Sequence, residues 1–190
     1  NDTWQTGSIP GAKDNGNPND PFTGWMNYGG LNRPVYLTVE PEFYLENLKV
    51  ETTPDLAKGT ALVRVKARVR NASAQSSVAK INPLVSFENQ QLKLTWKAGS
   101  ANIAAGQTAV VEAEVSLKTT EVKLWNLDDP NLYQLKVGLG TDTLSSAFGI
   151  RKLEVQNAQL LLNGVPIRVG GGNRVVDYPG QGGLEPDWLV

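Results

Sequence analysis

The stretch ALVRVKARVRN, residues 61–71, decides the fold class of this 190-residue chain. Apolar and basic side chains alternate along it with a period of two, which is typical of a β-strand with one buried face and one face in water. The apolar set is Val63, Val65, Ala67 and Val69, and the basic set is Arg64, Lys66, Arg68 and Arg70. We therefore expect a half-buried strand here, with the basic row on its outer face.

The same alternation recurs in three other segments, and no helical spacing of apolar residues competes with it. The segments are LKLTW (92–96), VVEAEVSLK (110–118) and YQLKVGL (133–139). The residues expected to point inward are Leu92, Leu94, Trp96, Val111, Ala113, Val115, Leu117, Tyr133, Leu135, Val137 and Leu139. Turn signals such as Ala105-Gly106 and Asp128-Asp129-Pro130 separate the strands. About seven short strands within about 100 residues predict an all-β fold, an immunoglobulin-like antiparallel β-sandwich without the cysteine pair of antibody domains.

The sandwich is expected to carry an N-terminal and a C-terminal extension from neighbouring domains. VYLTV (35–39) is predicted as a short strand, and Pro41 marks a boundary after it. We assign residues 1–40 to a linker or the end of an N-terminal domain, 41–150 to the sandwich and 151–190 to the C-terminal extension. In that extension, Asn163-Gly164 between two apolar runs predicts a hairpin turn. The final LEPDWLV (184–190) has the features of a helix start that is cut short.

The composition excludes several classes of site. Lys and Arg number 18 and Asp and Glu 19, for a formal net charge of -1, so no overall field attracts nucleic acid or an anionic membrane. The chain has no cysteine and no histidine, which excludes Ser-His-Asp and Cys-His hydrolases and histidine-ligated zinc. We expect no metal, cofactor, nucleic acid or membrane as a partner. No long apolar run and no targeting segment is recognisable, so the compartment stays open, with periplasmic and extracellular locations both compatible.

Four segments carry a family resemblance, in order along the chain. They are GWMNYGGLNRPVYL (24–37), LWNLDDPNLYQLKV (124–137), FGIRKLEV (148–155) and LLLNGVPIRVGGGNRVVDYP (160–179). Together they resemble glycoside hydrolase family 2, the family of β-galactosidases, β-glucuronidases and β-mannosidases. In that family the corresponding motifs end an N-terminal sugar-binding jelly roll, close the central sandwich, link the sandwich to a barrel and enter that catalytic barrel.

The resemblance implies that the chain is a domain fragment of a retaining, exo-acting β-glycosidase, an enzyme that hydrolyses O-glycosyl bonds in carbohydrate metabolism. Residues 151–190 would then be the linker and the truncated start of a TIM barrel, with Val165–Gly170 as a parallel barrel strand. The two catalytic glutamates of such an enzyme would lie on later barrel strands, so we assign no catalytic residue and expect the fragment to be inactive. The nearest match by residue type, Glu46-Asn47, has the wrong order and lies in a predicted sandwich strand.

By the same resemblance, Asn173, Arg174 and Asp177 would lie at the sugar pocket and contact the carbohydrate substrate in the parent enzyme. The family also uses the Asn-Arg pair partly to hold the architecture of the barrel. Val175 stands where many family members place a histidine. An apolar side chain cannot bind a sugar hydroxyl as a histidine does, which argues against classical β-galactosidase or β-glucuronidase specificity.

Other prominent side chains are expected to be structural. Trp125 and Tyr133 are predicted as core anchors, and Arg151 as a buried or interface partner in a salt bridge. The basic row of 61–71 is expected to find cross-strand partners in Glu112 and Glu114.

Two other functions remain open. One is an autonomous carbohydrate-binding module that uses Trp25 or Trp96 as a stacking platform. The other is a structural immunoglobulin-like interaction domain. End strands without neighbours leave backbone groups unpaired, so the tail from Asn157 is also predicted to fray or to self-associate with another copy.

Overall fold

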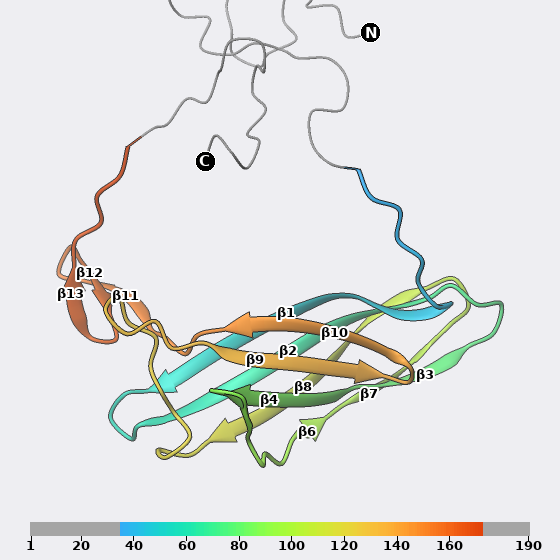
Figure 1. Cartoon of the computed structure of the whole chain (residues 1–190), viewed down its shortest axis with the longest axis horizontal. Coiled ribbons are helices and arrows are strands. Elements are labelled where there is room, and N and C mark those ends of the chain that lie inside the picture. Colours follow the sequence, from blue (N-terminus) through green and yellow to red (C-terminus); the bar gives the residue numbers. More distant parts are fainter. Residues whose placement is uncertain (1–34, 173–190) are drawn as a thin grey trace, which may run out of the picture. The chain divides into compact units, whose positions relative to one another are not determined.

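The computed structural model describes residues 35–172 (Figure 1). All of its strands lie in one compact unit, Val39–Val169. This part of the chain contains no helix, and each pair of neighbouring strands is antiparallel. Residues 35–172 accordingly contain no helical segment long and apolar enough to cross a membrane. The all-β prediction is confirmed.

Two four-stranded sheets form the sandwich. The first has the order β1-β2-β8-β6, with β1 (Phe43–Asp55), β2 (Thr60–Asn71), β8 (Thr108–Leu117) and β6 (Lys97–Ala98). The second has the order β10-β9-β4-β5, with β10 (Asp142–Phe148), β9 (Tyr133–Leu139), β4 (Asn82–Phe87) and β5 (Gln90–Gln91). This division of strands is that of a constant-type immunoglobulin domain, whose first two strands pair with the fifth and whose third pairs with the sixth. The fold prediction is confirmed.

Two smaller sheets complete the unit. One consists of β3 (Ser77–Lys80) and β7 (Ser100–Ile103). The other is a meander with the order β11-β12-β13, formed by β11 (Leu153–Gln156), β12 (Gln159–Leu162) and β13 (Val165–Ile167). We call this second small sheet the meander.

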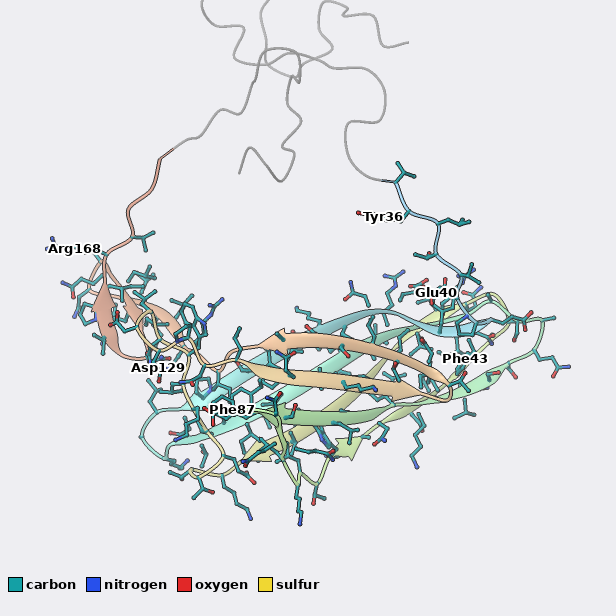
Figure 2. All side chains as sticks on the ribbon, viewed as in Figure 1. Tyr36, Glu40, Phe43, Phe87, Asp129 and Arg168 are labelled. Carbon is teal, nitrogen blue, oxygen red and sulfur yellow. The ribbon has the colours of Figure 1, made fainter. Side chains whose placement is uncertain are left out.

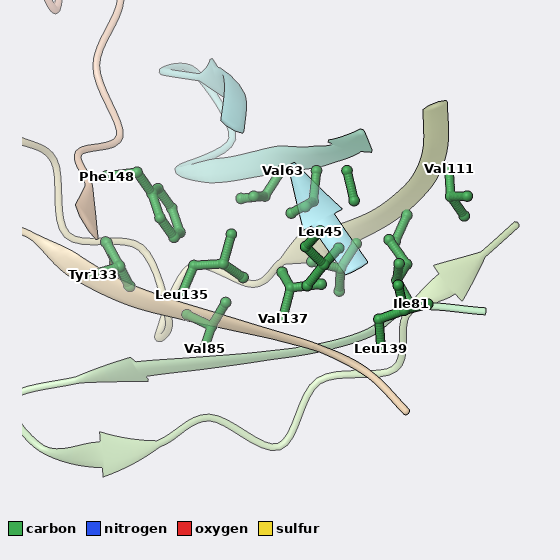
Figure 3. Close-up of a cluster of buried hydrophobic side chains, with 14 of the residues drawn as sticks. Leu45, Val63, Ile81, Val85, Val111, Tyr133, Leu135, Val137, Leu139 and Phe148 are labelled. Atoms are coloured by element: carbon green, nitrogen blue, oxygen red, sulfur yellow. The ribbon is translucent and has the colours of Figure 1, made fainter. Parts of the chain in front are cut away.

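The core lies between the two large sheets, where their inner side chains point toward one another (Figure 3). The inward residues predicted for β2, β8 and β9 are all buried. The alternation is regular in each case, as in β2, where Val63, Val65, Ala67 and Val69 are each at most 1% exposed. Burial of these side chains is the main stabilising contribution, because each removes apolar area from water.

The basic row on the outer face of β2 is neutralised by neighbouring strands. Arg64 lies opposite Glu114 in the register and forms an ion pair with it, with Nη2 2.7 Å from Oε2. Lys66 lies opposite Glu112 but pairs with Glu51 of β1, 3.1 Å away. The prediction of cross-strand partners is confirmed for Glu114, and the partner of Lys66 comes from the other neighbouring strand.

The prediction of a strand over LKLTW (92–96) was wrong. Leu92, Leu94 and Trp96 are half-buried against the core, as the alternation indicated. The Leu92 amide donates to the Val85 carbonyl of β4 at 2.9 Å, but beyond this bond the segment forms no ladder with another strand of the described residues. It runs between β5 and β6, which belong to different sheets. Alternation reports which side chains face the core, whereas a strand also needs a neighbour for its backbone groups.

The strand predicted over Val35–Val39 was also wrong. These residues have no strand partner, and the side chains of Val35, Tyr36, Leu37 and Val39 are each more than two-thirds exposed. The β-branched and aromatic composition favours a strand, but a strand is stable only in a sheet. Self-association through end strands stays a prediction.

The hairpin predicted at Asn163-Gly164 is confirmed. β12 and β13 pair antiparallel with Leu162 opposite Val165, and the two turn residues have φ of 52° and 83°, as a type I′ turn requires. The expectation of a parallel barrel strand over Val165–Gly170 was therefore wrong for β13, because this turn reverses the chain. The tail from Asn157 was expected to fray. This expectation is contradicted up to Ile167, since residues 159–162 and 165–167 are paired within the meander.

Candidate functional site

The residue pair nearest to a glycosidase motif in the sequence, Glu46-Asn47, lies in a strand of the sandwich. Glu46 and Asn47 lie in β1 at an irregularity of its register, and Glu46 Oε2 accepts a hydrogen bond from Arg68 Nε at 2.7 Å. Within residues 35–172, no three His, Cys, Asp or Glu side chains gather as a metal ion would need. Asn173, Arg174 and Asp177 lie outside the described residues.

Three of the motifs identified in the sequence come together at one place in the fold. The loop before β9, the segment after β10 and the turn of the β12–β13 hairpin meet at one end of the sandwich (Figure 1). We call this meeting point the junction and define it by residues 124–131, 148–152 and 163. It joins three of the four resembling segments, so it is the candidate functional site.

The first contact of the junction is between Trp125 and the chain after β10. The Trp125 amide donates to the Ile150 carbonyl at 2.8 Å, and Leu124 and Ile150 form a short parallel bridge. Gly149 lies so close that a Cβ placed there would be 2.9 Å from Trp125 Cβ. Only glycine fits here without displacing the tryptophan, which explains the Phe-Gly sequence at this point.

The Trp125 ring is covered by Arg151. The guanidinium carbon lies 4.8 Å from the ring centroid, a cation–π distance, and Arg151 is otherwise exposed. The prediction of a buried salt bridge for Arg151 was wrong, because Arg151 is exposed and lies over this aromatic ring within residues 35–172. The alternative of an interface salt bridge stays a prediction. Trp125 is half-buried, so it anchors the junction at the edge of the core. An open groove of about 450 Å³ adjoins the pair, lined also by Thr52 and Leu132.

Tyr133, at the start of β9, holds the base of the same loop. Its ring is fully buried between Phe87 and Phe148, with centroid distances of 4.9 and 5.2 Å. Its hydroxyl donates to the Glu121 carbonyl at 2.7 Å and accepts from the Lys123 amide at 2.7 Å. This is the tyrosine corner of immunoglobulin-like domains. Burial raises the pKa of Tyr133, which keeps the hydroxyl protonated as a donor.

The loop itself is tightened by Asp129 (Figure 2). Its carbonyl accepts from the amides of Asn126 at 3.0 Å and Asn131 at 2.9 Å, and its carboxylate accepts from Asn131 Nδ2 at 2.8 Å. The turn-forming role predicted for the Asp128-Asp129-Pro130 sequence is confirmed at Asp129. The carboxylate is used within its own loop.

Asn163 connects the meander to this loop. Its Nδ2 donates to the Trp125 carbonyl at 3.0 Å and to Asn126 Oδ1 at 2.7 Å. Its Oδ1 accepts from the Lys152 amide at 2.9 Å, and its own amide donates to the Lys152 carbonyl at 2.8 Å. One side chain thereby joins all three segments of the junction.

A family model tests independently the family resemblance that the motifs indicated. The family model described as "Glycosyl hydrolases family 2" matches residues 43–151, which is more than half of the chain. The chain belongs to glycosyl hydrolase family 2. The matched range begins with β1 and ends at Arg151 in the junction.

The family 2 chain is also similar to curated β-galactosidases. It is 29% identical over 168 residues to a β-galactosidase of Thermoanaerobacterium thermosulfurigenes, which covers 85% of this chain and 23% of that protein. A β-galactosidase of Vibrio vulnificus is 41% identical over 73 residues, or 35% of this chain and 7% of that protein. The chain spans about a quarter or less of the length of these relatives.

Solved structures confirm the fold of the family 2 domain. A β-glucuronidase of Bacteroides uniformis matches with a TM-score of 0.65 at 17% identity, over 78% of this chain and 19% of that one. A family 2 β-galacturonidase of Eisenbergiella tayi, bound to galacturonate, matches with a TM-score of 0.60 at 23% identity, over 77% and 25%.

Sequence reasoning found the parts of the family 2 junction but missed how they are joined. The resembling segments indicated Trp125, Arg151 and the Asn163 turn separately. The long-range hydrogen bonds of Asn163 had only one signal, its position before Gly164 in a motif. The hydroxyl contacts of Tyr133 could have been inferred from a tyrosine at the start of a sandwich strand.

Proposed function

We propose that this domain is the non-catalytic sandwich of an exo-acting β-glycosidase, in which it separates an N-terminal sugar-binding domain from a catalytic barrel and holds the chain that enters the barrel. The junction carries the proposal, because it fixes the segment after the sandwich to the sandwich itself. The length of the relatives supports it, since the chain corresponds to about a quarter or less of each.

The charges of two described carboxyl groups, Glu51 and Asp55, fit a non-catalytic role for these two residues. A glycosidase acid needs a pKa raised by its surroundings. Hydrogen bonds from Lys49 and Lys66 instead lower the pKa of Glu51. A hydrogen bond from Lys58 lowers the pKa of Asp55 in the same way. These groups are stabilised as carboxylates on the outer face of the sandwich, where they serve as ion-pair partners.

The burial of Trp96 argues against the carbohydrate-binding module. Its ring is half-buried and packs against the core, whereas a stacking platform needs a free aromatic face. Trp25 lies outside the described residues. In the proposed enzyme, carbohydrate contacts are assigned by resemblance to Asn173, Arg174 and Asp177.

The test compares this chain with a longer one. The purified 190-residue chain should hydrolyse no aryl β-galactoside, β-glucuronide or β-mannoside, and the same chain continued to the length of its relatives should hydrolyse at least one. A rate above buffer from the 190-residue chain would contradict the proposal. Titration with mono- and oligosaccharides is the second measurement, because binding at millimolar concentration or tighter would identify an autonomous carbohydrate-binding module.

A further inference from the structure

Asn163 is the polar connection between the meander and the sandwich. In residues 35–172, the hydrogen bonds that cross from β11–β13 and their turns to the loop before β9 both come from Asn163 Nδ2. Their acceptors are the Trp125 carbonyl and Asn126 Oδ1. A lost donor would leave these acceptors without their partner at a half-buried position, which costs more than an ordinary exposed hydrogen bond.

Apolar burial holds the meander only weakly. Leu162 is buried and Leu160, Leu161 and Ile167 are half-buried, but the other three are each more than half exposed: Leu153, Val155 and Val165. Within residues 35–172, β13 pairs only with β12. The β12–β13 hairpin is therefore the last paired element of the described residues, and Asn163 in its turn makes the contact with the sandwich loop.

We infer that Asn163 is a positioning residue, whose amide locks the β12–β13 hairpin onto Trp125 and Asn126 and so sets the direction in which the chain leaves the domain. The left-handed conformation of Asn163, with φ of 52°, is part of this role because it turns the side chain back toward the sandwich loop. Asn is one of the few residues that combine this conformation with a side-chain donor.

The chain supplies a matched control. Asn157 has the same residue type, a similar φ of 51° and a two-residue turn in the same meander. It is exposed, and within residues 35–172 its side chain makes no hydrogen bond to the junction, whose side-chain hydrogen bonds from the meander to the loop before β9 come from Asn163. A substitution at Asn157 therefore changes the turn without touching the lock.

Asn163→Asp removes the donor and keeps the size of the side chain and the acceptor for the Lys152 amide. Hydrogen exchange of the 190-residue chain should become about ten- to one-hundred-fold faster at the β12 amides, while the exchange of Val65 and Val115 stays unchanged. Asn157→Asp should leave the exchange rates of both regions close to those of the original chain. Asn163→Gly, which keeps the left-handed turn and lacks the amide, should repeat the result of Asn163→Asp.

Two outcomes would overturn the inference. If β12 and β2 lose protection together, Asn163 is an ordinary part of one cooperative structure. If neither changes, apolar packing such as that of Leu162 and the backbone hydrogen bonds hold the hairpin without the Asn163 side chain.

A kinetic test rests on the proposed function. In the full-length β-glycosidase, Asn163→Asp should lower kcat/KM about tenfold or more relative to Asn157→Asp, with the melting temperature of the sandwich unchanged, because misplacing substrate-contacting residues lowers the rate. Equal kcat/KM in both variants would overturn the positioning role. If the unsubstituted full-length protein hydrolyses no glycoside, the proposed function fails, and hydrogen exchange still decides whether Asn163 locks the hairpin.

Discussion

The sandwich and the meander are both antiparallel sheets, but they are held by different forces. The four inward residues of β2 are almost completely excluded from water, whereas three apolar residues of the meander are mainly exposed. The sandwich is stabilised by non-directional burial of apolar area, and the meander is oriented by directional hydrogen bonds from one side chain. Stability and orientation are thus supplied by separate parts of the domain.

The largest contrast should come from one substitution made in each region. Leu135→Ala removes a fully buried side chain of β9 and should lower the free energy of unfolding by about 2–5 kcal/mol. Leu153→Ala in the meander removes a side chain that is 55% exposed and should cost no more than about 1 kcal/mol. Urea unfolding with an unchanged m-value measures both. Similar losses at the two positions would break the distinction between the regions.

Gly149→Ala tests the boundary between the two regions. The added methyl would lie within 3 Å of Trp125, so the tryptophan or the chain after β10 must move, at a cost of about 1–3 kcal/mol. Trp125 carries the carbonyl that accepts from Asn163, so the meander should also lose protection from hydrogen exchange. Gly170→Ala is the control, because its Cβ would meet no atom of the described residues within 4 Å. Unchanged stability in Gly149→Ala would show that the junction is looser than its distances indicate.

The same distinction explains what the sequence could predict. The alternation in β2, β8 and β9 is a direct consequence of one buried face, so the fold class and the core residues of these strands were predictable. Alternation in 92–96 gave the correct facing of Trp96 but the wrong backbone, because it carries no information about strand partners.

The junction depends on contacts between distant residues, which local patterns do not encode. Arg151 was expected to meet a carboxylate, and within the described residues it lies over Trp125, since only the folded chain decides which partner is within reach. The hydrogen bonds of Asn163 span 37 and 38 residues, and its motif showed the turn but not its acceptors. The predicted sugar contacts Asn173, Arg174 and Asp177 lie outside the described residues, and they stay predictions.

Tyr133→Phe should destabilise the sandwich side of the junction by about 1–3 kcal/mol near neutral pH, because the Lys123 amide and the Glu121 carbonyl lose their shared partner. The pH dependence identifies the cause. Burial raises the pKa of Tyr133 above its ordinary value of 10.0, so on raising the pH the unfolded chain loses this proton first.

The stability contributed by protonated Tyr133 is therefore complete below pH 10 and is lost as the pH rises through the folded pKa. Unfolding measured between about pH 9 and pH 11 should show a steeper decrease for the original chain than for Tyr133→Phe. Parallel decreases would mean that the hydroxyl is not held by the corner.

The smallest effects should come from the ion pairs, and here the two regions offer a closely matched comparison. Arg64 and Glu114 have side chains that are 40% and 36% exposed, and Lys152 and Glu154 have side chains that are 44% and 40% exposed. Their ion-pair distances are 2.7 and 2.8 Å. The pairs differ in their setting, because Arg64 and Glu114 lie opposite each other on two central strands of the sandwich, whereas Lys152 and Glu154 flank the start of the meander.

Arg64 also donates from two nitrogens, Nε at 3.2 Å and Nη2 at 2.7 Å, to one oxygen of Glu114, and this interaction raises the pKa of Arg64. A double-mutant cycle with Arg64→Gln and Glu114→Gln should therefore give a larger coupling energy than one with Lys152→Gln and Glu154→Gln. The first coupling should appear in the global unfolding of the sandwich, and the second only in hydrogen exchange of the meander. Both should shrink as salt shortens the screening length from about 10 Å at 0.1 M to about 3 Å at 1 M. A larger coupling in the meander pair would mean that strand pairing in the sandwich does not pre-organise charges, because exposure and distance are nearly equal in the two pairs.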